Sequence, residues 1–304
     1  MKNPFFTVII PTFNRANKLP ICLDSVFSQT FTDFEIIIID NGSTDNTENI
    51  ILTEYNDSRI RYFRQEGSGS PANPRNQGIR KAGGVWVSFL DSDDVWYPEK
   101  LESVYNQIHE VSESDVVCHN ERMFDQMNLK SRNISHIRKA DDIYKSMLLE
   151  GNCLSSSATS IRKSFLTENE LFFNESPDFA IVEDYDFWLR LAKNGAVITF
   201  INKTLGDYVV DGDNMINDWQ RFITNLGNLY KHHAYVVQDF DQEKEKIYNQ
   251  LIAQIHFQRL KKALKERKCS EVINELSQIF SKSPTLLPRI IISKAFLVLD
   301  QARS

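Results

Sequence analysis

The sequence predicts an α/β protein built on an open, mostly parallel sheet, followed by a helical region. Three observations lead to this prediction. Short apolar runs alternate with helical periodicity over the first 120 residues, and polar residues follow those runs at their carboxyl ends. The stretch after about residue 216 has helical patterning and no clear strand. The 304 residues are 41% hydrophobic, enough for one large α/β domain with an appendage.

The predicted strands of the first part are almost continuously apolar, as expected when helices cover both faces of a parallel sheet. They are residues 6–10, 34–39, 59–63, 85–90 and 115–119. Apolar spacing, N-cap residues and prolines at helix starts predict the helices between them. These helices are residues 18–29, 43–55, a third from Pro71 or Pro74 to 82, and 98–111.

From 120 to 215 the pattern is less regular. It predicts strands at 155–161 and 196–202, and a helix at 182–194. Alternation of strands and helices along the chain implies right-handed crossovers between parallel strands.

Composition excludes several classes of protein. The net charge of −6 lacks the basic excess typical of a nucleic-acid binder. The cysteines, Cys22, Cys118, Cys153 and Cys269, form no C-x-x-C pair, which excludes a zinc ribbon and fits a reducing cytosol. No signal peptide is recognisable, and no run of about 18 apolar residues predicts a spanning helix. We therefore expect a cytoplasmic protein.

Polar residues gather where the predicted strands end. The segments are residues 11–14, 40–45, 71–78 and 91–94. Ligands of open α/β sheets bind outside the carboxyl ends of the strands. A rim of Asn, Asp, Ser and Arg suits a nucleotide, which needs hydrogen bonds for its base and ribose and a cation for its phosphates.

Asp91 and Asp93 flank one residue on a strand-to-loop turn. Mg²⁺ and Mn²⁺ take carboxylate and phosphate oxygens, often through one or two protein carboxylates and the phosphates of the substrate. The pair therefore predicts a divalent cation site. The alternative, also open, is that Asp94 caps the following helix and the other acids belong to a solvated turn.

Four segments, in this order and at these separations, resemble the inverting glycosyltransferases of family 2, which have the GT-A fold. They are TVIIPTFNR, IIIIDNGSTDNT, NPRNQGIRKAGGVWVSFLDSDD and VEDYDFWLRLAKNG. The resemblance extends over about residues 5–210. It implies a GT-A catalytic domain at 1–215, with a nucleotide-binding half to about 120 and an acceptor half at 121–215. Residues 216–304 then form a helical C-terminal extension.

The resemblance implies a donor site. Its residues would be Pro11, Thr12, Asn14, Asp40, Arg75, Asp91 and Ser92. Asp40 would face the uracil of a UDP-linked donor, and Arg75 would approach the diphosphate. Asp91 and Asp93 match the DXD motif, with Asp93 as the direct ligand of Mn²⁺ or Mg²⁺. Many members also have a His after the next strand, but here the stretch 207–213 has none. Either Asp211 substitutes as an oxygen ligand, or the metal has no protein ligand at that position.

The resemblance also implies that Asp184 is the catalytic base. Its neighbours Glu183 and Asp186 make a second interpretation possible, namely acids favoured in the first turn of a helix. Glu183, Trp96 and Trp188 are further candidates for acceptor contact. For both tryptophans a place in the core is the alternative.

Our hypothesis is a metal-dependent transfer, with inversion, of one sugar from a nucleotide-diphosphate donor to a saccharide or lipid-linked saccharide, in surface glycan synthesis. The leaving diphosphate requires a Lewis acid, and the acceptor hydroxyl requires a base. The alternatives are a sugar-nucleotide pyrophosphorylase and a non-catalytic module that binds nucleotide sugars. The hypothesis requires Asp40, Asp91, Asp93 and Asp184 to converge on one cleft.

The C-terminal region carries a basic segment, Arg259–Lys268. It is either a solvated helix face or a peripheral contact with anionic lipid at the inner face of the membrane. In the second interpretation Leu260, Leu264 and the apolar run Leu286–Leu299 provide the apolar edge. The same helices are candidates for a homodimer contact.

Overall fold

The computed structural model describes residues 3–211, 218–237 and 243–284. The chain separates into two compact units: Met1–Met147 with Asn152–Asp218, and Leu148–Gly151 with Trp219–Ser304. Asp213 and the run Leu286–Leu299 lie outside the described residues. All four cysteines are free thiols, and those at 22, 118 and 153 are buried.

The first unit begins with four parallel strands in the order β3-β2-β1-β4. They are β1 (Phe6–Thr12), β2 (Phe34–Asp40), β3 (Ile60–Arg64) and β4 (Trp86–Phe89). Thr12 pairs with Asp40, and Asp40 with Arg64, so three strands end level at one edge of the sheet. The loops that follow these strands therefore meet at this edge.

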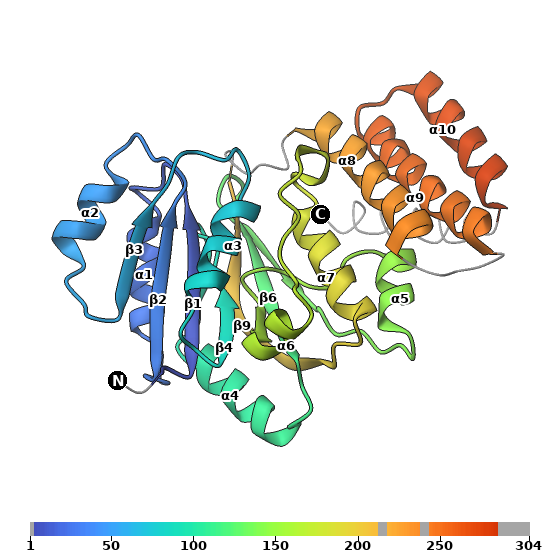
Figure 1. Ribbon diagram of the computed structural model, residues 1–304. Coiled ribbons are helices and arrows are strands. Elements are labelled where there is room, and N and C mark those ends of the chain that lie inside the picture. Colours follow the sequence, from blue (N-terminus) through green and yellow to red (C-terminus); the bar gives the residue numbers. More distant parts are fainter. Residues whose placement is uncertain (1–2, 212–217, 238–242, 285–304) are drawn as a thin grey trace. The chain divides into compact units, whose positions relative to one another are not determined.

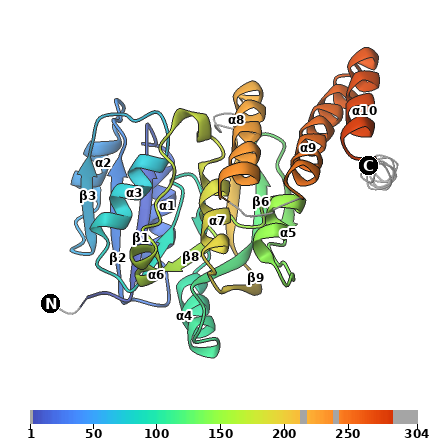
Figure 2. The same cartoon turned by 45° about the vertical axis from the view of Figure 1, so that its right-hand side comes forward.

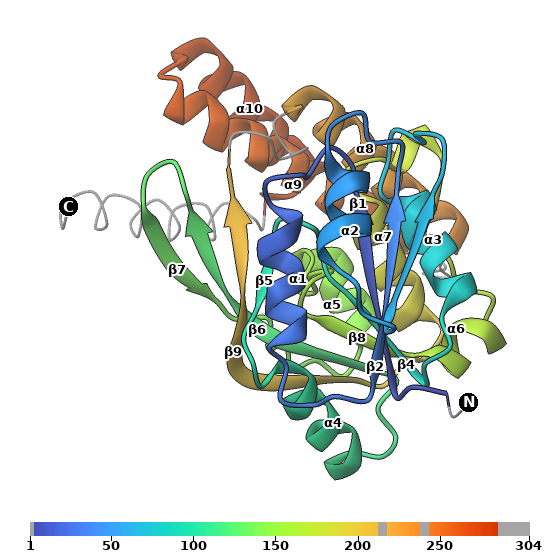
Figure 3. The ribbon, with the colours of Figure 1, turned by 90° about the vertical axis from the view of Figure 1, so that its left-hand side faces the viewer.

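Helices cover both faces of these strands. They are α1 (Leu19–Phe27), α2 (Thr47–Glu54), α3 (Ala72–Lys81) and α4 (Lys100–Glu110). Figure 3 shows the strands edge-on, with α1 on one side and α3 on the other. A glycine at 78 allows α3 to approach the sheet, since a Cβ there would lie 2.4 Å from the Ile9 side chain.

The sheet continues from β4 in the order β8-β6-β9-β5, with β7 paired to β6. Figure 1 labels β4, β6 and β9 of this series, and Figure 3 labels β5, β7 and β8 as well. These strands are β5 (Val95–Trp96), β6 (Val116–Asp125), β7 (Lys130–Ile134), β8 (Thr159–Arg162) and β9 (Ile198–Val210). β8 is antiparallel to β4 and β6, and β9 is parallel to β6. Six of the nine strands in the described chain thus run in one direction, as a mostly parallel sheet requires.

The strand order differs from a simple crossover series. β6, the predicted fifth strand, does not pair with β4, because the antiparallel β8 lies between them. β6 and β9 also extend further than predicted, to Asp125 and Val210, and they pair along most of this length. Residues 120–125 and 203–210 thus add strand length that the sequence did not predict.

Four further helices are short or amphipathic. They are α5 (Ile143–Glu150), α6 (Lys163–Glu168), the 3-10 turn η1 (Pro177–Phe179) and α7 (Glu183–Lys193). α5 belongs to the first unit up to Met147 and to the second unit from Leu148. Phe187, Trp188 and Leu191 of α7 are fully buried, and Phe187 stacks on Phe173 with ring centroids 4.0 Å apart. This packing fixes where the first turn of α7 lies.

The described part of the second unit is helical, as predicted. It contains α8 (Trp219–His232), the π-helix η3 (His233–Val237), α9 (Lys244–Lys265) and α10 (Cys269–Lys282). α9 and α10 lie side by side (Figure 2). Leu260 is buried between them against Ile279, and Leu264 packs against the same cluster. The apolar edge expected for a lipid contact is therefore covered at Leu260.

In the described ranges, no helix combines the length and apolarity that crossing a membrane requires.

Candidate active site

A cavity of about 1090 Å³ opens at the carboxyl ends of the parallel strands. One side, here called the first wall, comes from the loops after β1, β2, β3 and β4. It comprises Pro11, Thr12, Phe13, Asn14, Arg15, Asn41, Gly67, Gly69, Ser70, Pro71, Pro74, Arg75, Asp91, Ser92 and Asp93. The opposite side, the second wall, comprises Glu121, Ile134, His136, Leu154, Ser155, Ser156 and Tyr208. Ile181, Glu183 and Asp184, at the start of α7, complete the lining.

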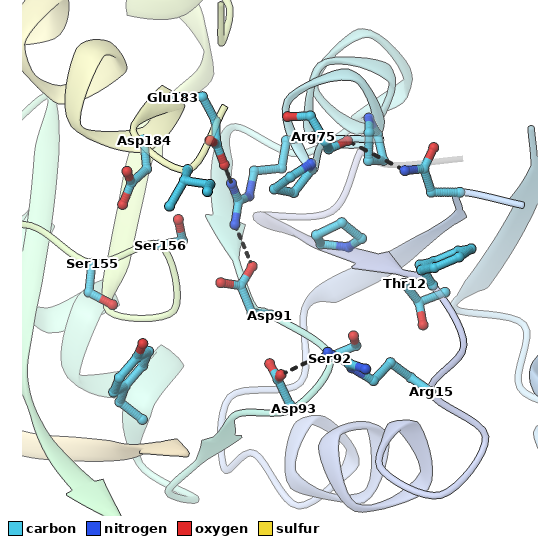
Figure 4. A pocket seen from close by; sticks show the side chains of 18 of the residues that line it. Thr12, Arg15, Arg75, Asp91, Ser92, Asp93, Ser155, Ser156, Glu183 and Asp184 are labelled. Atoms are coloured by element: carbon cyan, nitrogen blue, oxygen red, sulfur yellow. Dashed lines mark hydrogen bonds and ion pairs between the residues drawn. The ribbon is translucent and has the colours of Figure 1, made fainter. Parts of the chain in front are cut away.

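Figure 4 shows this arrangement, with Thr12 and Arg15 on one side, Ser155 and Asp184 on the other, and Arg75 and Asp91 between them. Of the predicted donor-site residues, all but Asp40 line the cavity. The Thr12 hydroxyl is buried and has no hydrogen-bond partner within the described structure. A buried polar atom without a partner is costly, so this hydroxyl is suited to a ligand.

Asn14 holds two loops of the first wall together. Its backbone N–H donates to the Ser43 hydroxyl at 2.9 Å, and its side-chain oxygen accepts from the Thr44 N–H at 2.8 Å. Its φ of +51° lies in the left-handed region, where Asn is better tolerated than most residues. Asn14 therefore shapes the loop after β1.

The predicted contact between Asp40 and a base is wrong for this structure. Asp40 is fully buried and does not line the cavity. Its carboxylate accepts hydrogen bonds from the Tyr62 hydroxyl and the Ser43 N–H, both at 2.7 Å. The neighbouring Asn41 lines the cavity instead, and its backbone N–H donates to the Thr12 carbonyl at 2.8 Å. Because side chains alternate along a strand, the residue after Asp40 reaches the opposite side.

Arg75 connects the two acidic parts of the site. From the first turns of α3 it donates to Asp91 at 2.7 Å and to Glu183 at 3.2 Å. Its side chain is only 5% exposed, and the two paired carboxylates keep it charged in spite of this burial. The charges of Asp91 and Glu183 raise the pKa of Arg75 against the opposing effect of burial. Removal of this guanidinium would leave Glu183 buried without its charge partner.

Each carboxylate expected to bind metal lies beside a basic side chain. Asp91 pairs with Arg75, Asp93 with Arg15 at 3.4 Å, and Asp211 with Lys18. Asp211 is not part of the cavity lining, so the predicted third ligand does not join Asp91 and Asp93. Burial, followed by the charge of Asp91, raises the pKa of Asp93.

Within the described ranges, no group of three or more His, Cys, Asp and Glu side chains is arranged to hold a metal ion. Asp91 and Asp93 nevertheless line the same cavity and offer carboxylate oxygens, the ligands that Mg²⁺ and Mn²⁺ prefer. Two carboxylates fit a cation whose other ligands come from substrate phosphates and water.

Asp94 does not cap the following helix. β5 begins immediately after it, and α4 starts only at Lys100. The Asp94 carboxylate accepts from the Ser157 hydroxyl at 2.5 Å and from the Val209 N–H at 2.8 Å. Asp94 thereby ties the loop after β4 to the turn before β8 and to β9.

Asp184 lies in the first turn of α7 and lines the cavity. Burial, followed by the charge of Glu183, raises its pKa to about 7. Such a value suits a group that exchanges a proton near neutral pH.

Three residues before Asp184, Ile181 has a φ of +73°, an outlier for a β-branched residue. Backbone strain of this kind is concentrated at functional sites.

The predicted contacts of Trp96 and Trp188 with an acceptor are wrong, because both side chains lie in the core. Trp96 is 2% exposed, and its indole N–H donates to the Ser157 carbonyl at 2.7 Å. Trp188 is fully buried among Phe89, Phe173 and Phe187. The aromatic residues that line the cavity are Phe13 and Tyr208.

The sequence predicted Glu183 and Asp184 at the start of α7 as site residues, but it gave no role to any residue of the second wall. Its members are Glu121, Ile134, His136, Leu154, Ser155, Ser156 and Tyr208. The available signal was weak: Glu121 and Tyr208 belong to strands that continue beyond their apolar runs.

Residues 7–170 match the family model described as glycosyl transferase family 2. The chain belongs to this family. A relative from Rickettsia typhi, an uncharacterized glycosyltransferase, is 29% identical over 238 residues, which are 76% of this chain and 70% of the relative. In two further Rickettsia relatives the aligned region is only 37% of the relative's length.

Solved structures establish the GT-A fold for this family 2 member. S. aureus TarS 1-349 in complex with UDP-GlcNAc superposes with a TM-score of 0.67 at 22% identity, covering 91% of this chain and 81% of the TarS 1-349 chain. A mannosyltransferase from Pyrobaculum calidifontis, in complex with GDP-Man and Mn²⁺, superposes with a TM-score of 0.61 at 16% identity. The match covers 98% of this chain and 81% of the mannosyltransferase chain.

Proposed function

We propose that this chain transfers one hexosyl or N-acetylhexosaminyl residue, with inversion, from a nucleotide-diphosphate sugar, most plainly a UDP-sugar, to a saccharide or lipid-linked saccharide. The catalytic domain is residues 1–215, and surface glycan synthesis is the process it serves. One observation carries the proposal: the DXD pair Asp91–Asp93 and the base candidate Asp184 line a single cavity at the strand ends. Family membership favours this over a pyrophosphorylase or a silent binding module.

In this proposal the first wall binds the donor. Thr12 and Asn41 offer polar groups to the base and ribose at the ends of β1 and β2. Arg15 and Arg75 are the cations available to the diphosphate. Asp91 and Asp93 would hold Mn²⁺ or Mg²⁺, which when bound neutralises charge on the leaving diphosphate. The UDP-GlcNAc and GDP-Man complexes of the two solved neighbours support a nucleotide-sugar donor.

Asp184 acts on the acceptor. Its carboxylate takes the proton of the acceptor hydroxyl while the hydroxyl oxygen bonds to the anomeric carbon. The bond from that carbon to the diphosphate oxygen breaks, and the nucleoside diphosphate leaves. Attack from the face opposite the leaving group inverts the anomeric configuration. Glu183, paired with Arg75, holds the first turn of α7 beside the donor site.

The test measures UDP release from a panel of UDP-sugars by the purified chain with Mn²⁺ and an acceptor mixture. The wild-type chain should release UDP, whereas D93A and D184N should lose at least about 99% of turnover, as general base and metal contributions imply. D57N is the matched control, because Asp57 pairs with Arg59 on the surface, away from the cavity. Unchanged turnover in both site variants would refute the assignment.

A further inference from the structure

The second wall carries a buried pair of ionisable side chains with no role so far. We propose that Glu121, positioned by His136, contacts the acceptor and that the sugar unit received there is uncharged. This inference rests on the proposed function, because it requires that the first wall holds the donor. Glu121 comes from β6, and His136 follows β7.

The pair is held in one orientation. His136 Nε2 lies 2.9 Å from a Glu121 carboxylate oxygen, and Nδ1 lies 3.1 Å from the Cys153 carbonyl oxygen. The backbone N–H of His136 also donates to the Asn120 side-chain oxygen at 2.9 Å. The two side-chain contacts, together with this backbone contact, leave the imidazole little freedom to lose when a ligand binds.

The same contacts decide which member of the pair can meet a ligand. A carbonyl oxygen only accepts, so Nδ1 donates to the Cys153 carbonyl, and Nε2 is engaged by Glu121. Both ring nitrogens of His136 are therefore used within the protein, and Glu121 is the member that can hydrogen-bond to a ligand in the cavity.

Stability alone is a weak reason for this pair, because buried ion pairs stabilise a fold little compared with apolar residues of similar size. Glu121 and His136 are 2% and 8% exposed, yet both border the cavity. Cys153, which accepts from His136, precedes the cavity-lining segment Leu154–Ser156. Figure 4 places Ser155 and Ser156 on the same side of the cavity as Asp184. A ligand on this wall thus lies beside the proposed base.

The charges around the cavity favour an uncharged acceptor unit. Arg15 and Arg75 are the lysine or arginine residues that line it among the described residues, and both pair with acids of the donor site or Glu183. A phosphate or uronate on the second wall would face Glu183 and Asp184 with no cation to spare. Serine and tyrosine hydroxyls with neighbouring apolar side chains suit the hydroxyls and faces of a neutral pyranose.

The first test uses variants that keep side-chain volume. With the nucleotide sugar that the wild type turns over, E121Q and H136Q should raise the acceptor KM about tenfold, the cost of one lost charged hydrogen bond. Donor KM and acceptor-independent donor hydrolysis should stay within about twofold of wild type, since the first wall is untouched. R132Q, on the exposed face of β7, is the control. A merely structural role would instead lower the melting temperature and affect both substrates together.

The second test needs no variant. Binding of methyl β-glucoside, methyl β-N-acetylglucosaminide, methyl β-glucuronide and glucose 6-phosphate to the wild-type chain with UDP and Mn²⁺ is measured by saturation-transfer NMR. An uncharged glycoside should bind about tenfold more tightly than either anion. Equal or tighter binding of an anion, or no binding of any uncharged glycoside, overturns the inference. If UDP itself fails to bind, the proposed function fails instead.

Discussion

The two walls of the cavity are built in different ways. The first wall comes from loops that each follow a parallel strand, so neighbouring sequence motifs become neighbours in space. The second wall comes from β6, β9, the segment after β7 and the segment before β8, which meet through long-range pairing. The first wall is rich in ion pairs, whereas the second offers hydroxyls and the Glu121–His136 pair. The difference suggests one wall for a charged donor and one for a neutral acceptor.

The largest effect should come from removing the base between the walls. D184N should lower kcat by about 10²- to 10⁴-fold, the usual contribution of a general base. Affinity for UDP should change little, because the first wall does not depend on Asp184 for its hydrogen bonds. Steady-state kinetics and UDP titration check this. A parallel loss of UDP affinity would contradict the division of roles.

Arg75 joins the first wall to the start of α7 through Asp91 and Glu183, so its loss should destabilise both. R75Q leaves Glu183 buried without its charge partner and should cost about 3 kcal/mol of unfolding free energy. R61Q removes an ion pair with Glu35 on an arginine that is 42% exposed, and should cost less than about 1 kcal/mol. Urea unfolding compares the two. Similarly small losses of unfolding free energy in the two variants would mean that the buried ion pairs of Arg75 do not hold the first wall to the start of α7.

A smaller effect is expected in how the melting temperature depends on pH. The folded pKa of Asp184, about 7, lies above its ordinary value of 3.8, so its protonated form stabilises the fold at low pH. That contribution is lost as the pH rises through 7. D184N should therefore melt a few degrees higher than wild type at pH 8 and at about the same temperature at pH 3.5. A constant difference across this range would assign the effect to something other than the charge.

The smallest effect concerns metal binding to the first wall without nucleotide. Arg15 lies beside Asp93 and competes with a cation for that carboxylate. R15Q should tighten Mn²⁺ binding to the nucleotide-free chain about fivefold, equivalent to about 1 kcal/mol for a partly exposed pair. Calorimetric titration measures this directly, with R59Q as the surface control. Weaker Mn²⁺ binding in R15Q would contradict the competition.

The contrast between the walls also explains what the sequence could predict. The apolar runs of β1 and β4 and the polar residues after them are local signals, and they indicated Thr12 and Asp91, which line one cavity. The prediction for Asp40 failed because side chains alternate at the end of the strand. Asp40 points into the core, and Asn41 faces the cavity. The family resemblance, rather than periodicity, picked out Asp184.

The second wall was hidden from sequence reasoning for a physical reason. Glu121 and His136 meet across the β6–β7 pairing, and Cys153 reaches them from a segment with no regular structure. Nothing local distinguishes such residues from surface polar residues. Trp96 and Trp188 failed for the opposite reason: an aromatic side chain near a functional motif is more often core, and here both are buried.

The central claim is that the first wall binds a nucleoside diphosphate together with a divalent cation through Asp91 and Asp93. Calorimetric titration of UDP into the wild-type chain, with and without Mn²⁺, tests it most directly. We expect one UDP per chain, binding at least about tenfold more tightly with Mn²⁺, and loss of that enhancement in D93A but not in D184N. UDP affinity that is independent of Mn²⁺, or an enhancement that survives in D93A, would contradict the claim.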